Sequence, residues 1–146
     1  MQYGRPTEEK LILIIDDSED DIFLFKRLLA RSGIVNRTHS ITTGEEARAY
    51  LDGSGHYADR QKWPIPSIII LDLCLPGGNG FEFLQWCRAH HACKHSLIIV
   101  LSGSSEAPMS RRAYELGANS FLVKPARSAD LEKLIHAHPQ HWERKG

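Results

Sequence analysis

The sequence contains no apolar run that approaches the roughly 18 residues needed to cross a bilayer. Its first residues, MQYGRPTEEK, are polar and lack the apolar core of a secretory signal peptide. An excess of charge is also missing, because 18 Lys and Arg residues balance 18 Asp and Glu residues. A balanced chain has no general attraction to nucleic acid or to anionic membranes. We therefore expect a cytoplasmic protein whose partners are neither nucleic acid nor a membrane.

Cysteine is scarce as well. The chain has three cysteines, Cys74, Cys87 and Cys93, and this odd number predicts free thiols in a reducing compartment rather than a structural disulfide. Internal repeats and low-complexity tracts are absent from the sequence. With 146 residues, of which 42% are hydrophobic, the chain is long enough for one domain with its own core. We place this domain at residues 10–138, between an N-terminal tail, 1–9, and a C-terminal tail, 139–146.

Four short apolar runs stand out, because each one ends in a polar side chain. LILII leads into Asp16 and Asp17, SIIIL into Asp72, LIIVL into Ser102, and NSFLV into Lys124 and Pro125. Runs rich in Ile, Val and Leu are typical of strands buried on both faces of a parallel sheet. The carboxyl ends of such strands share one edge, where α/β proteins bind ligands. The sequence therefore predicts that three carboxylates, a hydroxyl and an ammonium meet at this edge.

Helical patterns alternate with these strands, which predicts an α/β fold with a doubly wound, five-stranded parallel sheet. A polar segment, Arg37–Ile41, is expected to form the remaining strand near an edge of the sheet. The helices are expected to run from a cap at Ser18 to Gly33, over Glu45–Leu51, from Gly80 onward, up to Gly117, and from a cap at Ser128. Residues 52–66 exceed the usual connection length and contain two prolines, so we expect a surface loop.

The charges at the shared edge predict its chemistry. Three neighbouring carboxylates repel one another, which raises the pKa of at least one of them and favours a bound cation. Hard oxygen ligands indicate Mg²⁺, with Mn²⁺ as a substitute. A nucleophilic carboxylate, a divalent ion, a lysine and a hydroxyl are the groups that phosphoryl transfer needs, because its catalysis is mainly positioning and charge neutralisation. The edge is therefore interpreted as a site that accepts a phosphoryl group.

With these residues in this order, the chain resembles a response-regulator receiver domain, the CheY-like phosphoacceptor module of two-component and phosphorelay signalling. The resemblance implies a flavodoxin-like sheet with strand order 2-1-3-4-5. It also implies that a sensor histidine kinase phosphorylates Asp72, and that Asp17, Asp72 and the backbone carbonyl of Cys74 hold Mg²⁺. In this family, Asp16 would act on the metal mainly through water.

The same resemblance assigns roles to the other strand ends. Ser102 would hydrogen-bond the attached phosphoryl group, Lys124 would pair with it, and a cis peptide bond would precede Pro125. Phe121 occupies the position of the switch aromatic, where the family often has Tyr. Cys74 stands where an Asn or another polar residue is common, and its side chain positions an attacking water poorly, so the lifetime of the phosphoryl group is an open point.

The segments ILDLCLPGGNGFEFL and AYELGANSFLVKP, with the long loop before the third strand, resemble the single-domain regulators that partner phytochromes and related hybrid kinases. We expect a stand-alone response regulator and not an enzyme, beyond its self-phosphorylation and autodephosphorylation. Its output would pass through contacts of this domain. One expected contact is the interface of a homodimer. Three elements would form it: the helix with Met109 and Tyr114, the strand with Phe121 and the helix with Leu131.

Several alternatives remain open. The chain is also consistent with a phosphorelay intermediate that passes its phosphoryl group to a histidine phosphotransfer protein, or with a scaffold that acts without phosphorylation. A phosphohydrolase with an aspartyl-phosphate intermediate would need a general acid where Cys74 stands. The segment CRAHHACKH, residues 87–95, suggests a transition metal but matches no zinc spacing, and histidines near a helix C-terminus are favourable without one.

Overall fold

The computed structural model describes residues 9–74, 80–104 and 106–145 of the 146-residue chain, so the predicted N-terminal tail lies outside the described residues except for Glu9. Five strands form one parallel sheet with the order β2-β1-β3-β4-β5, which confirms the predicted flavodoxin-like topology. The strands are β1 (Ile12–Ile15), β2 (Thr38–Ile41), β3 (Ile68–Asp72), β4 (Leu97–Ser102) and β5 (Ser120–Val123).

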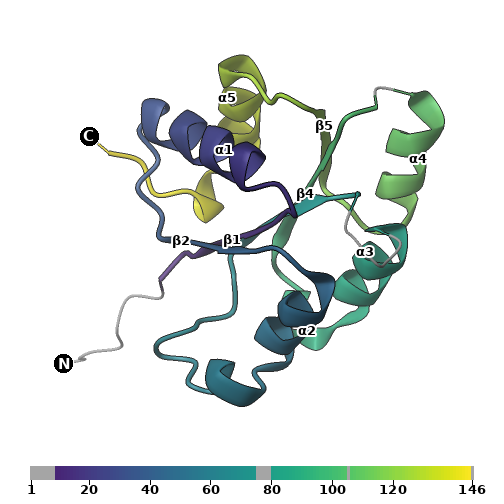
Figure 1. Ribbon diagram of the computed structural model, residues 1–146. Coiled ribbons are helices and arrows are strands. Elements are labelled where there is room, and N and C mark those ends of the chain that lie inside the picture. The colour runs from purple at the N-terminus through teal and green to yellow at the C-terminus, as the bar shows by residue number, and fades with distance from the viewer. Residues whose placement is uncertain (1–8, 75–79, 105, 146) are drawn as a thin grey trace.

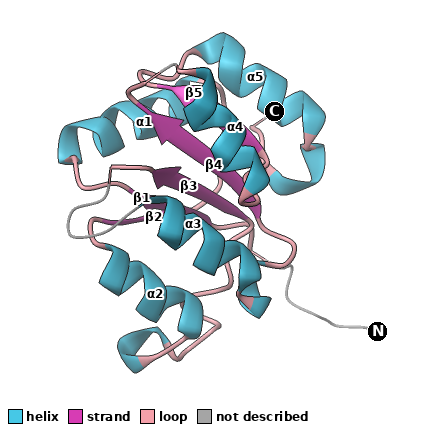
Figure 2. Ribbon diagram, turned by 90° about the vertical axis from the view of Figure 1, so that its right-hand side faces the viewer, coloured by secondary structure: helices cyan, strands magenta, loops and turns pink. Residues whose placement is uncertain are grey.

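Helices cover both faces of the sheet, as a doubly wound fold requires. Figure 1 shows α1 (Glu19–Arg31) and α5 (Ser128–Ala137) on one face, and α2 (Gly44–Asp52) and α3 (Gly80–Ala89) on the other, which also carries α4 (Ala107–Glu115). Alternate residues of β1 divide between the two cores: Ile12 and Ile14 face α1 and α5, whereas Leu13 and Ile15 face α2 and α3. The view in Figure 2 shows the sheet between these two layers. No helix in the described ranges is long and apolar enough to span a bilayer.

Of the two predicted N-terminal caps, at Ser18 and Ser128, the structure confirms the first. Ser18 caps α1, because its Oγ accepts a hydrogen bond of 3.2 Å from the Asp21 N–H. The predicted cap at Ser128 is wrong, since Ser128 is the first helical residue of α5. Here the Asp130 carboxylate accepts a 3.1 Å hydrogen bond from the Arg127 N–H, so an acid inside the first turn satisfies the helix start.

The polar strand β2 lies at the edge of the sheet, as predicted, and the long loop beside it is partly buried. Tyr57 of this loop is 1% exposed, and its hydroxyl donates to Glu46 of α2 and lies 3.1 Å from His39 Nε2. Arg60 donates hydrogen bonds of 2.9 and 2.8 Å to the carbonyls of Tyr50 and Leu51. The segment predicted as a surface loop is therefore attached to α2 and β2 by buried contacts.

The segment after α5 also packs against the domain. Residues Pro139–His141 form a short 3-10 helix, and Ile34 and Arg144 form an antiparallel bridge. Asn36 holds this segment through a 3.1 Å bond from its Nδ2 to the His141 carbonyl and a 2.7 Å bond from the Glu143 N–H to its Oδ1. Trp142 is buried in the core between α1 and α5. Residues 139–145 thus cover one end of that core.

Candidate phosphoacceptor site

Three carboxylates meet at the carboxyl edge of the sheet, as the sequence predicts. Asp16 and Asp17 directly follow β1, and Asp72 is the last residue of β3, the strand paired with β1. One possible ligand atom from each carboxylate lies within 4.8 Å of the other two. Asp16 and Asp72 are buried, whereas Asp17 is exposed. The group therefore opens to solvent on the Asp17 side.

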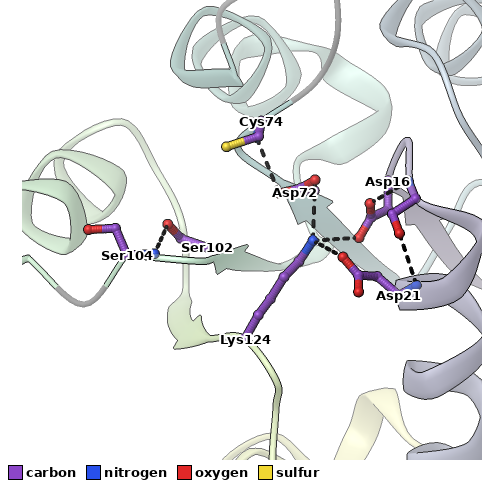
Figure 3. A network of polar contacts seen from close by, with 8 residues as sticks. Asp16, Asp21, Asp72, Cys74, Ser102, Ser104 and Lys124 are labelled. Carbon is purple, nitrogen blue, oxygen red and sulfur yellow. Dashed lines mark hydrogen bonds and ion pairs between the residues drawn. The ribbon is translucent and has the colours of Figure 1, made fainter.

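Lys124 brings the balancing positive charge to this edge from the end of β5. Its Nζ lies 3.0 Å from Asp16 Oδ2, 3.3 Å from Asp72 Oδ2 and 2.8 Å from Asp21 Oδ2. Figure 3 draws these three contacts as dashed lines. The peptide bond between Lys124 and Pro125 is cis, as the family pattern implies. One ammonium group thus contacts three carboxylates, which lie directly after β1, at the end of β3 and in the first turn of α1.

Burial and charge shift the pKa values at this site in opposite senses. Burial raises the pKa of Asp16 and the Asp72 charge adds to the rise, while hydrogen bonds from the Ser18 N–H and Lys124 oppose it. Burial also disfavours the Lys124 ammonium, but its hydrogen bonds to Asp21 and Asp16 outweigh this effect and raise its pKa. Lys124 is therefore charged at neutral pH, and the buried carboxylate Asp16 favours a further cation.

Ser102 and Cys74 complete the edge. Ser102 is buried at the end of β4, and its Oγ accepts a 3.1 Å hydrogen bond from the Ser104 N–H (Figure 3). A 2.7 Å bond from the Lys124 N–H to the Ser102 carbonyl holds the ends of β4 and β5 together. Cys74 is exposed beside the acids, and its N–H donates a 3.2 Å bond to Asp72 Oδ1. The predicted hydroxyl and backbone positions therefore flank Asp72.

Phe121 lies in the middle of β5, where it is half-buried against the core under α3 and α4. This is the position that the resemblance assigns to the switch aromatic. Gly77 and Gly78, which follow the acceptor in the sequence, lie outside the described residues.

Asp21 is the site residue that the sequence analysis missed. The first turn of α1 carries three acids in succession, Glu19, Asp20 and Asp21, and negative charge at a helix N-terminus is favourable without any further partner. The local sequence therefore gives no signal that separates Asp21 from Glu19 and Asp20. The contact with Lys124 singles out Asp21 from its two neighbours.

The donor set fits a divalent cation such as Mg²⁺ or Mn²⁺. Asp16, Asp17 and Asp72 offer hard carboxylate oxygens, and the charge that they concentrate already attracts Lys124. Within the described part of the chain, the Cys and His residues of 87–95 form no comparable cluster. Cys87 and Cys93 instead contact each other in the core, with their Sγ atoms 3.3 Å apart and both thiols free.

Comparison with known proteins agrees with this geometry. The response regulator receiver domain profile matches residues 12–136. Response regulator Rcp1 from Synechocystis is 31% identical over 133 residues, which are 91% of this chain and 88% of Rcp1. The Mn²⁺-bound crystal structure of Rcp1 superposes with a TM-score of 0.71 at 30% identity, covering 90% of this chain and 92% of Rcp1.

Two further solved structures are similar along most of their length. The response regulator RPA3017, described in red light signaling of R. palustris, has a TM-score of 0.77 at 30% identity and covers 94% of this chain and 96% of its own. The phosphorylated cyanobacterial phytochrome response regulator RcpA has a TM-score of 0.73 at 30% identity, with coverages of 92% and 94%. From the matched profile, the acid cluster and the sheet order together, the chain belongs to the response regulator receiver domain family.

Proposed function

We propose that this protein is a stand-alone response regulator that accepts a phosphoryl group on Asp72. The observation that carries the proposal is the contact of one partly buried lysine, Lys124, with Asp72 and Asp16 at an edge that also presents Asp17. An Asp72 oxygen attacks the phosphorus of a phosphohistidine, the P–N bond breaks, and the released imidazole nitrogen keeps the electron pair and takes up a proton. The product is an aspartyl phosphate.

The side chains around Asp72 have distinct roles in this reaction. Asp16, Asp17, Asp72 and the backbone carbonyl of Cys74 would hold Mg²⁺, which neutralises charge on the phosphoryl oxygens when it is bound. Lys124 pairs with a phosphoryl oxygen, and Ser102 donates its O–H to another, while its Oγ can keep accepting from the Ser104 N–H. The half-buried Phe121 then changes its packing against α4. Beyond this self-modification, we propose no enzymatic activity.

The partner we propose is a sensor histidine kinase of the phytochrome-like or hybrid type. Support comes from the relatives, because RcpA is described as a phytochrome response regulator and RPA3017 is described in red light signaling. The setting we propose is the cytoplasm, without nucleic acid or membrane partners.

Mass spectrometry of the intact protein tests the proposed function. We expect the wild type to gain one phosphoryl group after incubation with acetyl phosphate and Mg²⁺, and to gain none when the metal is removed by chelation. The metal dependence follows from the charge of the acid cluster, which would repel an anionic phosphodonor. A wild type that stays unmodified at short and long times would contradict the proposal and favour the scaffold that acts without phosphorylation.

A role as a phosphorelay intermediate predicts transfer of the phosphoryl group from Asp72 to a histidine phosphotransfer protein, and absence of transfer to any such partner would contradict this role.

We also propose a homodimer through the α4, β5 and α5 face, where Tyr114 is 50% and Val123 is 38% exposed. Sedimentation that shows monomer both with and without the phosphoryl group would remove the dimer.

Cys74 is expected to lengthen the lifetime of the aspartyl phosphate. Its exposed thiol lies two residues from Asp72 and is a poor hydrogen-bond partner for an attacking water. Cys74→Asn should therefore speed loss of the phosphoryl group several-fold, as followed by intact mass after removal of acetyl phosphate. Cys74→Ala is the matched control and should keep the wild-type rate. Equal rates for the Asn and Ala variants would show that this side chain does not control hydrolysis.

A further inference from the structure

Asp21 makes the shortest contact of the Lys124 ammonium, although it lies outside the acid trio. The distance from Nζ is 2.8 Å to Asp21 Oδ2, against 3.0 Å to Asp16 and 3.3 Å to Asp72. The Asp21 side chain is 39% exposed, compared with 4% for Asp16 and 5% for Asp72. Figure 3 shows the Lys124 ammonium in contact with Asp21 of α1 and with the two strand-end acids, Asp16 and Asp72.

The local structure holds Asp21 in place. Its backbone N–H is bound by the Ser18 hydroxyl, which caps α1, and the Ser18 N–H in turn donates a 2.9 Å bond to Asp16. The first turn of α1 is thus tied to the acid trio through two consecutive hydrogen bonds. Asp21 and Lys124 also line the same groove, whose apolar wall is formed by Leu24, Leu28, Pro125 and Ala126. The ion pair therefore lies beside the acceptor and in contact with solvent.

A cation held by the trio would change the balance of these contacts. It would compete with Lys124 for the carboxylates of Asp16 and Asp72, because both positive charges seek the same oxygens. Asp21 is not part of the group close enough to share one ion, so it would keep its full attraction for Lys124. In that state, Asp21 and a phosphoryl group on Asp72 are the two anions that compete to bind the Lys124 ammonium.

We propose that Asp21 is a positioning residue that holds Lys124 at the edge of the site and competes with the phosphoryl group for it. This inference rests on the proposed function, since it concerns the same phosphoryl group. Asp21 touches neither the acceptor nor the reacting atoms, and acts through Lys124. Phosphorylation then requires the Lys124–Asp21 ion pair to give way, so Asp21 lowers the occupancy of the phosphorylated state. Removing its charge therefore strengthens binding of a phosphoryl group.

The test is Asp21→Asn, which keeps the shape of the side chain and removes its charge. Beryllofluoride, a phosphoryl mimic, is titrated into the protein in saturating Mg²⁺ by calorimetry, and the rate of acetyl phosphate labelling is followed by intact mass. We expect the variant to bind beryllofluoride about two- to fivefold more tightly, the range for a partly exposed ion pair. Labelling at low acetyl phosphate should be faster by a similar factor.

Two control variants separate this role from a general effect of charge. Asp20→Asn removes the same charge from the same helical turn at an exposed position, and it should leave both measurements near the wild type. Asp21→Glu retains the carboxylate and should stay closer to the wild type than Asp21→Asn does. Equal changes in the Asp20 and Asp21 variants, or weaker binding by Asp21→Asn, would overturn the inference. A wild type that binds no beryllofluoride in saturating Mg²⁺ would instead overturn the proposed function itself.

Discussion

Replacing Asp72 with Ala is expected to abolish phosphoryl labelling completely. The substitution removes the carboxylate that we propose as the nucleophile, and neither Asp16 nor Asp17 stands at the end of β3, where Asp72 pairs with Leu101, the residue before Ser102. Intact-mass spectrometry with acetyl phosphate and Mg²⁺ should show one phosphoryl group on the wild type and none on the variant.

The Asp72 variant should remain folded, so its loss of labelling can be attributed to the missing carboxylate and not to unfolding. The loss of one acid from a group of three relieves repulsion, and Lys124 keeps Asp16 and Asp21 as partners. Thermal unfolding checks this point, and Asp20→Ala serves as the control that keeps its labelling. An adduct that persists on the folded Asp72 variant would place the acceptor at another residue and contradict the proposed site.

Trp142→Ala should destabilise the protein by about 3 kcal/mol or more, the cost of emptying a large aromatic side chain from a core. Trp142 is 6% exposed and belongs to the same core as Leu29, Ile34 and Ile135. The indole therefore closes the end of the α1–α5 layer. Urea unfolding followed by circular dichroism measures the free energy of unfolding without depending on the fluorescence of the deleted residue.

Trp142→Phe is the matched control for this prediction. The Trp142 Nε1 is buried and has no hydrogen-bond partner within the described residues, so Phe removes an unpaired donor while it keeps an aromatic ring. Removing the unpaired donor should stabilise the core, whereas the smaller ring fills the core less completely. These effects oppose each other, and we expect a net loss of stability below about 1.5 kcal/mol. A Trp142→Ala variant as stable as the wild type would mean that residues 139–145 contribute little to the fold.

The strands could be anticipated because their signal is local, whereas their order followed from the resemblance to the receiver family. Each buried strand of a parallel sheet is a continuous apolar run, and the alternation with helical patterns requires a doubly wound sheet. The helix start at Ser128 was less accessible, because Asp130 and a serine at the first position are both acceptable near a helix N-terminus. Only the path of the backbone shows that Asp130, and not Ser128, accepts the hydrogen bond at the start of α5.

The acid trio, Ser102 and Lys124 were determined by the sequence alone, since the carboxyl ends of parallel strands must share an edge whatever the details of packing. The tertiary structure decided the rest. Lys124 contacts Asp21, which lies 103 positions earlier in the chain, and Trp142 packs in the core that contains residues of α1. Such contacts depend on where α1 and residues 139–145 lie in space. Neither position is encoded in a local pattern, because a helix N-terminus tolerates several acids and a short segment after the last helix has no periodicity to read.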